Sequence, residues 1–221
     1  MKETIYTIPI NEIFEEKSGC PICKIKSMLE QNFVQYIVGD AMMEPSIRVI
    51  VNQKGFCNKH FKDMLSLGSK LPIALMLESH LQEIIEGQDS YKNKDSLKKF
   101  TTGCFVCDDV TKYMDNMLKN ILTTWHNEAD FRDLYSGQKF ICAEHCYMLL
   151  DYGSKSKILK FSERREFLET THSLMLRYLK TLKADISHFC QMYDYRNIGG
   201  EWGNSKDSIE RSVDFLTTTN H

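Results

Sequence analysis

The stretch Cys20-Pro21-Ile22-Cys23 is followed, 34 positions after its second cysteine, by Cys57-Asn58-Lys59-His60. The same arrangement recurs later, where Cys104-Phe105-Val106-Cys107 is followed, 35 positions after its second cysteine, by Cys142-Ala143-Glu144-His145. Each half therefore offers three thiols and one imidazole, which is the donor set of a closed tetrahedral zinc site. The predicted ligand sets are Cys20, Cys23, Cys57 and His60 in the first half, and Cys104, Cys107, Cys142 and His145 in the second.

The metal that these ligand sets favour is zinc, two ions per chain. Iron, as a mononuclear or clustered centre, stays open because thiolates serve both metals. Lys24 and Asp108 follow the two Cys-x2-Cys pairs where a covalent haem would need histidine. Four protein ligands leave no position for water, so the spacing indicates structural zinc; Glu144 could act as a base only if one ligand were labile.

Further residues repeat in the same register, which predicts an internal duplication of a unit of roughly 70–80 residues. The matching segments are Glu44–Arg48 with Glu128–Arg132, Gln53-Lys54 with Gln138-Lys139, and Gly68–Lys70 with Gly153–Lys155. If the duplication is real, residues 20–87 and 104–180 should show the same helix order. Arg48 should then lie where Arg132 lies.

The composition excludes several classes of protein. Among 221 residues, 42% are hydrophobic and 26% are charged, which is ordinary for a globular protein with a real core. The net charge of −2 gives no electrostatic footprint for nucleic acid or an anionic membrane. Eight cysteines without a signal peptide or a long apolar run indicate metal ligation in a reducing compartment, so we expect a cytoplasmic protein.

The periodicity of apolar residues is helical almost throughout, and the predicted fold class is all-α, with an internally duplicated unit whose repeats each hold one Cys3His site. Each Cys-x2-Cys and each Cys-x2-His pair is expected at a helix N-terminus. The predicted organisation is an N-terminal repeat (1–87), a polar linker (88–103), a C-terminal repeat with a long helix (104–193), and a tail with a short helix (194–221).

Four residues outside the ligand sets carry separate expectations. His80 falls on an apolar helix face and is expected in the core. Cys146 adjoins His145 and is expected to be a half-buried helix residue, with an alternative ligand or redox partner as the other reading, and Cys190 is expected in the core. Trp202 stands in a turn-rich segment and is expected to anchor on the chain's own helices, with a partner or dimer contact as the alternative.

The chain resembles an uncharacterised family of cytoplasmic proteins from anaerobic Gram-positive bacteria. The resemblance covers nearly the whole chain but implies no activity. The segments that carry it are Ile5–Asn11, Cys20–Cys23, Met43–Pro45, Gly55–His60, Asp194–Asn197 and Trp202–Asp207.

From the residues we expect a non-enzymatic zinc-binding protein with two structural sites, acting as an adaptor or interaction protein. A thiol-based redox or metal sensor is the first alternative and would need exposed thiolates. An iron protein, or a metalloenzyme with a labile ligand, is the second and would need a concave pocket beside a metal. The expected partner is another protein or a second copy, with no nucleic acid and no membrane.

Overall fold

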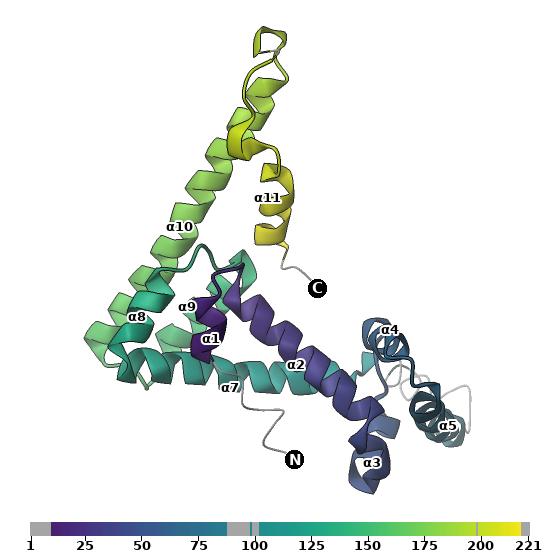
Figure 1. Cartoon of the computed structure of the whole chain (residues 1–221). Coiled ribbons are helices and arrows are strands. Elements are labelled where there is room, and N and C mark those ends of the chain that lie inside the picture. The colour runs from purple at the N-terminus through teal and green to yellow at the C-terminus, as the bar shows by residue number, and fades with distance from the viewer. Residues whose placement is uncertain (1–9, 88–97, 99–101, 198, 218–221) are drawn as a thin grey trace. The chain divides into compact units, whose positions relative to one another are not determined.

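A computed structural model describes residues 10–87, 98, 102–197 and 199–217 (Figure 1). Those residues form helices joined by turns and loops, with no strand among them, so the predicted all-α class is confirmed. None of the helices within these ranges combines the length and apolar character that crossing a membrane requires. Most of the predicted linker, 88–103, lies outside the described residues.

The chain divides into two compact units, and each is described by itself. Among the described residues, the Cys57 unit comprises 28–87, 98 and 102–115, and the Cys20 unit comprises 10–27, 116–197 and 199–217. Two helices belong to both units: α2 (Pro21–Val38) passes from the Cys20 unit into the Cys57 unit, and α7 (Phe105–Asn127) passes back. The units are therefore interleaved along the chain, whereas the predicted repeats were contiguous.

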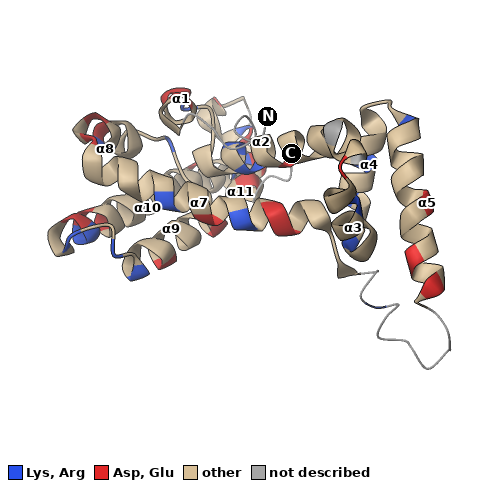
Figure 2. Ribbon diagram, turned by 90° about the horizontal axis from the view of Figure 1, so that it is seen from below, with Lys and Arg blue, Asp and Glu red and all other residues tan. Residues whose placement is uncertain are grey.

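Within the described residues, the Cys57 unit contains the later part of α2, the start of α7 and several shorter elements. These are η1 (Asp40–Met43), α3 (Pro45–Lys54), α4 (Asn58–Ser66) and α5 (Lys70–Glu86). Helix α5 packs on α3 and buries Ile73, Met76 and His80. Its charges oppose the helix dipole, since Lys70 stands at its start and Glu86 at its end (Figure 2). Packing against α3, rather than end charges, therefore stabilises α5.

The Cys20 unit is built around α10, a helix of 32 residues. Its elements are α1 (Ile10–Glu15), α8 (Ala129–Ser136), α9 (Ala143–Lys155), α10 (Phe161–Met192), η2 (Tyr195–Asn197), η3 (Gly203–Ser205) and α11 (Ser208–Leu216). Both α9 and α11 pack on α10. Trp125 lies at the centre of an aromatic core, with ring centroids 5.1 Å from Tyr135 and 5.2 Å from Phe167. Thr171 satisfies the buried Tyr135 hydroxyl at 2.8 Å.

Apart from η1, which has no counterpart after α7 among the described residues, the two predicted repeats share an order of elements: a long helix, a short helix, a helix that opens with Cys-x2-His, and a second long helix. Arg48 and Arg132 have different partners. Arg48 Nη2 donates to Ser79 Oγ at 3.4 Å, while Arg132 Nε donates to the Trp125 carbonyl at 2.8 Å, near the end of α7. The shared order agrees with a duplication, and the duplication itself stays a prediction.

Candidate metal centres

The structure brings all eight predicted ligands into two groups, but it pairs them differently from the prediction. The Cys20 cluster consists of Cys20, Cys23, Cys142 and His145, and the Cys57 cluster consists of Cys57, His60, Cys104 and Cys107. Within each cluster the donor atoms all lie within 4.8 Å of one another. The predicted grouping, with one site inside each half, is therefore wrong: each Cys-x2-Cys pair meets the Cys-x2-His pair of the other half.

The length of α2 and α7 explains this exchange. Helix α2 starts directly after Cys20 and runs for 18 residues, which carries the chain about 27 Å along the helix axis before α3 begins. Cys57 follows α3, so it reaches the cluster in the unit where α2 ends. Helix α7, with 23 residues, starts in the Cys57 unit and ends in the Cys20 unit, so Cys142, which follows it, joins the cluster of Cys20 and Cys23.

Helix starts position the donors in both clusters, as predicted. Cys57 and Cys142 are the N-cap residues of α4 and α9, with extended backbone angles of φ −74°, ψ 164° and φ −62°, ψ 161°. His60 and His145 follow three positions later, one helical turn on, so each histidine lies beside its N-cap cysteine. Pro21 occupies the first position of α2, where its missing N–H costs no hydrogen bond.

The spacing of donor atoms in the Cys20 cluster fits a tetrahedral metal. Around zinc, the usual bond lengths place sulfurs about 3.8 Å apart and a sulfur and nitrogen about 3.6 Å apart. Cys23 Sγ lies 3.6 Å from Cys142 Sγ. His145 Nδ1 lies 3.1 Å from Cys142 Sγ, 3.3 Å from Cys23 Sγ and 3.7 Å from Cys20 Sγ.

The Cys57 cluster has the same geometry. Cys57 Sγ lies 3.9 Å from Cys107 Sγ. His60 Nδ1 lies 3.2 Å from Cys57 Sγ, 3.3 Å from Cys104 Sγ and 3.5 Å from Cys107 Sγ. Glu30 Oε1 lies 4.0 Å from His60 Nε2, the ring nitrogen that faces away from the sulfurs. Both clusters can thus hold a metal ion through three sulfurs and one Nδ1.

Burial determines the protonation of these donors in the metal-free chain. It lowers the pKa of His145 to about 4 and also lowers that of His60, so both imidazoles are neutral near pH 7 and can ligate. Burial raises the pKa of Cys20 to about 12, and partial desolvation together with the neighbouring Cys104 and Cys57 thiols raises that of Cys107 to about 12. These thiols therefore keep their protons until a metal displaces them.

The two clusters differ in the exposure of their sulfurs. In the Cys20 cluster, Cys20 and Cys142 are buried and Cys23 is half-buried, so Cys23 is the partly solvent-accessible thiol. In the Cys57 cluster, Cys104 is buried, Cys57 is half-buried and Cys107 is exposed. A small reagent can therefore reach the Cys57 cluster more easily.

Backbone contacts join the loops that precede the ligands of the Cys57 cluster. The Gly55 carbonyl accepts a hydrogen bond from the Phe105 N–H at 3.0 Å. Gly55 has φ +65°, and a Cβ there would lie 2.7 Å from His80 Nε2. A Cβ at Gly103 would lie 2.5 Å from the Lys54 carbonyl oxygen, so both positions need glycine. His80 is buried and its Nδ1 lies 2.6 Å from the Asn52 carbonyl oxygen, which confirms it as a core histidine.

Gln138 joins the segments that carry the ligands of the Cys20 cluster. The sequence did not lead us to predict this contact. The Gln138 side chain is 1% exposed, and Nε2 donates to the Phe14 carbonyl at 2.6 Å and to the Leu134 carbonyl at 2.9 Å. It thereby ties the loop before Cys142 to the helix before Cys20. The match between Gln53-Lys54 and Gln138-Lys139 was the available signal, although it did not reveal the contact.

Neither remaining cysteine belongs to a cluster. Cys146 is fully buried on α9, more deeply than predicted, and its Sγ lies 3.7 Å from the Thr171 carbonyl oxygen. Cys190 is exposed, so the prediction that it lies in the core is wrong. Its place near the end of α10 explains the difference, because Leu182 is the last buried residue of that helix.

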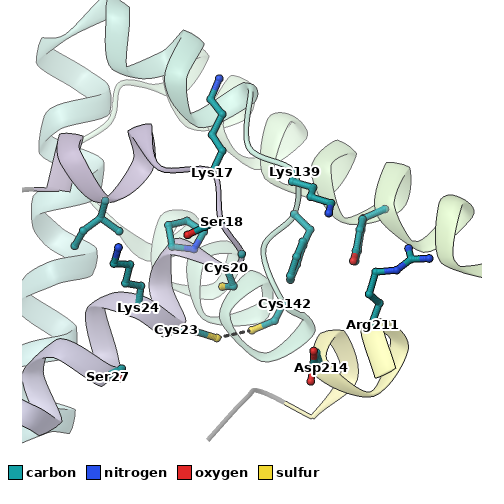
Figure 3. A pocket seen from close by; sticks show the side chains of 15 residues that line it. Lys17, Ser18, Cys20, Cys23, Lys24, Ser27, Lys139, Cys142, Arg211 and Asp214 are labelled. Carbon is teal, nitrogen blue, oxygen red and sulfur yellow. Dashed lines mark hydrogen bonds between the residues drawn. The ribbon is translucent and has the colours of Figure 1, made fainter. Parts of the chain in front are cut away.

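A cavity of about 520 Å³ opens beside the Cys20 cluster, and Figure 3 shows Cys20, Cys23 and Cys142 gathered in it. Its other walls come from the loop before α2, the loop before α9, α10 and α11. They include the stacked pair Phe140 and Tyr178, whose ring centroids lie 4.4 Å apart at an interplanar angle of 10°. The cavity is the concave site that a metalloenzyme would need, although all four donors of the adjacent cluster come from the protein.

Comparisons with known proteins agree with the family expected from sequence. A family of unknown function, DUF6062, matches residues 1–221. An uncharacterised 23.9 kDa protein encoded in the xynA 3′ region of Caldicellulosiruptor sp. (strain Rt8B.4) is 23% identical over 195 residues, which cover 85% of this chain and 88% of that protein. No solved structure matches. With its whole length matched, the chain belongs to the family of unknown function DUF6062.

Proposed function

We propose that this protein is a non-enzymatic zinc-binding protein whose two Cys3His sites are structural. The observation that supports zinc is the spacing of the donors, with sulfur–sulfur distances of 3.6 and 3.9 Å where tetrahedral zinc needs about 3.8 Å. Four protein donors complete each shell. Each ion joins two segments that are distant in sequence, so its binding energy becomes folding energy.

The metal content of the purified chain tests this proposal. Protein purified without oxygen should contain two zinc ions per chain by elemental analysis. Less than one metal per chain would contradict the proposal. Strong absorbance at about 400 nm would replace zinc by an iron–thiolate or iron–sulfur centre.

The surface of the Cys57 unit supports a role in protein interaction. Val49 on α3 and Leu71, Leu81 and Ile85 on α5 are all exposed, and such apolar side chains commonly mark interaction sites where they gather. The proposed partner is another protein or a second copy of the chain, not nucleic acid or membrane. Thiolate ligands must stay reduced to bind zinc, and this requirement supports the proposed location in the cytoplasm.

The exposure of Cys107 favours a second candidate function, a thiol-based sensor. Oxidation of Cys107 or the half-buried Cys57 would remove a ligand and release zinc from the Cys57 cluster, while the more buried Cys20 cluster would keep its metal. Under dilute hydrogen peroxide, a sensor should release one zinc per chain quickly and reload it after thiol reduction. Slow, simultaneous loss of both ions would leave the structural role alone.

A further inference from the structure

The cavity beside the Cys20 cluster is cationic, although the chain as a whole carries a net charge of −2. Four cationic side chains line it against one carboxylate. They are Lys17, Lys24, Lys139 and Arg211, with Asp214 as the acid (Figure 3). A divalent metal held by three thiolates and a neutral imidazole would carry about one negative charge. Cationic side chains outnumber carboxylates among the residues that line the cavity, and such a lining attracts anions.

Two charged residues beside the Cys57 cluster stand at positions equivalent to Lys139 and Lys24 beside the Cys20 cluster. Lys54 stands three residues before Cys57, and it forms an ion pair with Asp108, directly after Cys107. At the corresponding positions of the Cys20 cluster stand Lys139 and Lys24, two like charges. The internal ion pair of one cluster is thus replaced by a pair of cations in the other.

Several of the cavity's cations already have protein partners. Lys24 pairs with Glu16, and Arg211 donates to Asp185 and Asp207 at 2.9 Å each. Within the described ranges, neither Lys17 nor Lys139 has an ion pair or side-chain hydrogen bond.

The two unpaired lysines come from loops on the same side of the cavity. Lys17 adopts φ +48° in the loop before α2. Its ammonium lies 3.5 Å from the Cβ position of Gly137, two residues before Lys139. Figure 3 draws Lys139 above Cys142, whereas the Lys17 side chain extends upward, away from Cys20. Among the described residues, Lys139 therefore offers an unpaired ammonium at this rim of the cavity.

We propose that this cavity binds a small phosphate ester, with Lys139 contacting the phosphate. Ammonium groups bind phosphate as point charges, whereas the planar fork of Arg211, which would suit a carboxylate, is already taken by two aspartates. The start of α2 adds the positive end of a helix dipole. The aromatic pair Phe140 and Tyr178 lines the same cavity and gives the organic part an apolar wall, and the volume is within the range of small-molecule sites.

Calorimetric titration of the full chain, with its metal content measured in the same samples, tests the proposal. The probe is phenyl phosphate, compared with inorganic phosphate and phenol. Lys139→Gln should weaken phenyl phosphate binding about tenfold, since one charge-assisted hydrogen bond is lost. Asp214→Asn should strengthen binding because it removes the cavity's carboxylate. Lys54→Gln is the matched control in the Cys57 unit and should leave binding unchanged.

Three outcomes would overturn the inference. The first is a fully metallated chain that binds no phenyl phosphate, which would leave the proposed zinc sites standing. The second is Lys139→Gln lowering the zinc content without changing phosphate affinity, because the lysines would then only balance the thiolate charge. The third is a single-stranded oligonucleotide binding more tightly than phenyl phosphate through Lys139, which would assign the cations to nucleic acid.

Discussion

At the scale of single residues, the clusters depend on neighbours that ligate nothing. Gly55 accepts no side chain because its φ is +65° and His80 fills the space beside it, while Gln138 uses its buried amide to hold two loops together. Substitutions at such positions should therefore disturb a cluster whose ligands are all intact.

Gly55→Ala is expected to destabilise the Cys57 unit by about 1–3 kcal/mol, since the new Cβ strains the backbone and displaces His80. Denaturant unfolding of the zinc-loaded chain measures the change. Gly68→Ala is the matched control, because Gly68 has φ +81° but no atom within 4 Å of its Cβ position. Equal losses in the two variants would show that the His80 contact is unimportant.

Zinc loading should release protons. The pKa values of Cys20 and Cys107, both raised to about 12, mean that the thiols are protonated in the metal-free chain at pH 7, and ligation requires thiolate. About three protons are expected from the Cys20 cluster and fewer from the Cys57 cluster, because the burial of the Cys57 sulfur is outweighed by hydrogen bonds that lower its pKa. An indicator dye in weak buffer measures the release. The histidines should contribute none, since burial lowers their pKa values. Bound zinc should accordingly be lost as the pH falls.

At the scale of elements, the helices and their ligand-bearing starts were predictable, because apolar periodicity and the Cys-x2-Cys spacing are local signals. The predicted helix from Ser162 to about Tyr193 is α10, Phe161–Met192. The exchange of ligand pairs was not predictable from spacing alone, since either Cys-x2-Cys pair can complete a Cys3His site with either Cys-x2-His pair. The burial of Gln138 and the exposure of Cys190 depend on which helices cover them, and no short-range pattern records that.

The tail after α10 provides a prediction at this scale. Trp202 is half-buried, and its ring lies 5.4 Å from Phe189 and 5.7 Å from Tyr193 between centroids, which supports an anchor on the chain's own helix. Trp202→Ala should cost about 1–3 kcal/mol, less than a fully buried tryptophan would. Thermal melting measures the loss. An unchanged melting temperature with an altered oligomeric state in light scattering would indicate a partner contact instead.

At the scale of the whole molecule, each metal site joins parts of both halves, so pairs of substitutions can reveal the grouping. Cys20→Ser with Cys142→Ser damages one cluster and should leave one zinc per chain. Cys20→Ser with Cys57→Ser damages both clusters and should leave none. Elemental analysis compares the two double variants. If Cys20→Ser with Cys142→Ser left no zinc, and Cys20→Ser with Cys57→Ser left one, each half of the sequence would hold its own metal site.

The exchanged pairing also sets an order of assembly during synthesis. Cys57 and Cys107 are 50 positions apart, while Cys23 and Cys142 are 119 apart, and the shorter loop is nested within the longer one. On the ribosome, the inner loop has all its ligands once residue 107 emerges, whereas the two earliest cysteines must wait for His145. If the inner loop closes first, the outer loop has a shorter flexible chain to close. The entropic cost of closing the outer loop is then lower. The ligands made first are thus the last to receive metal.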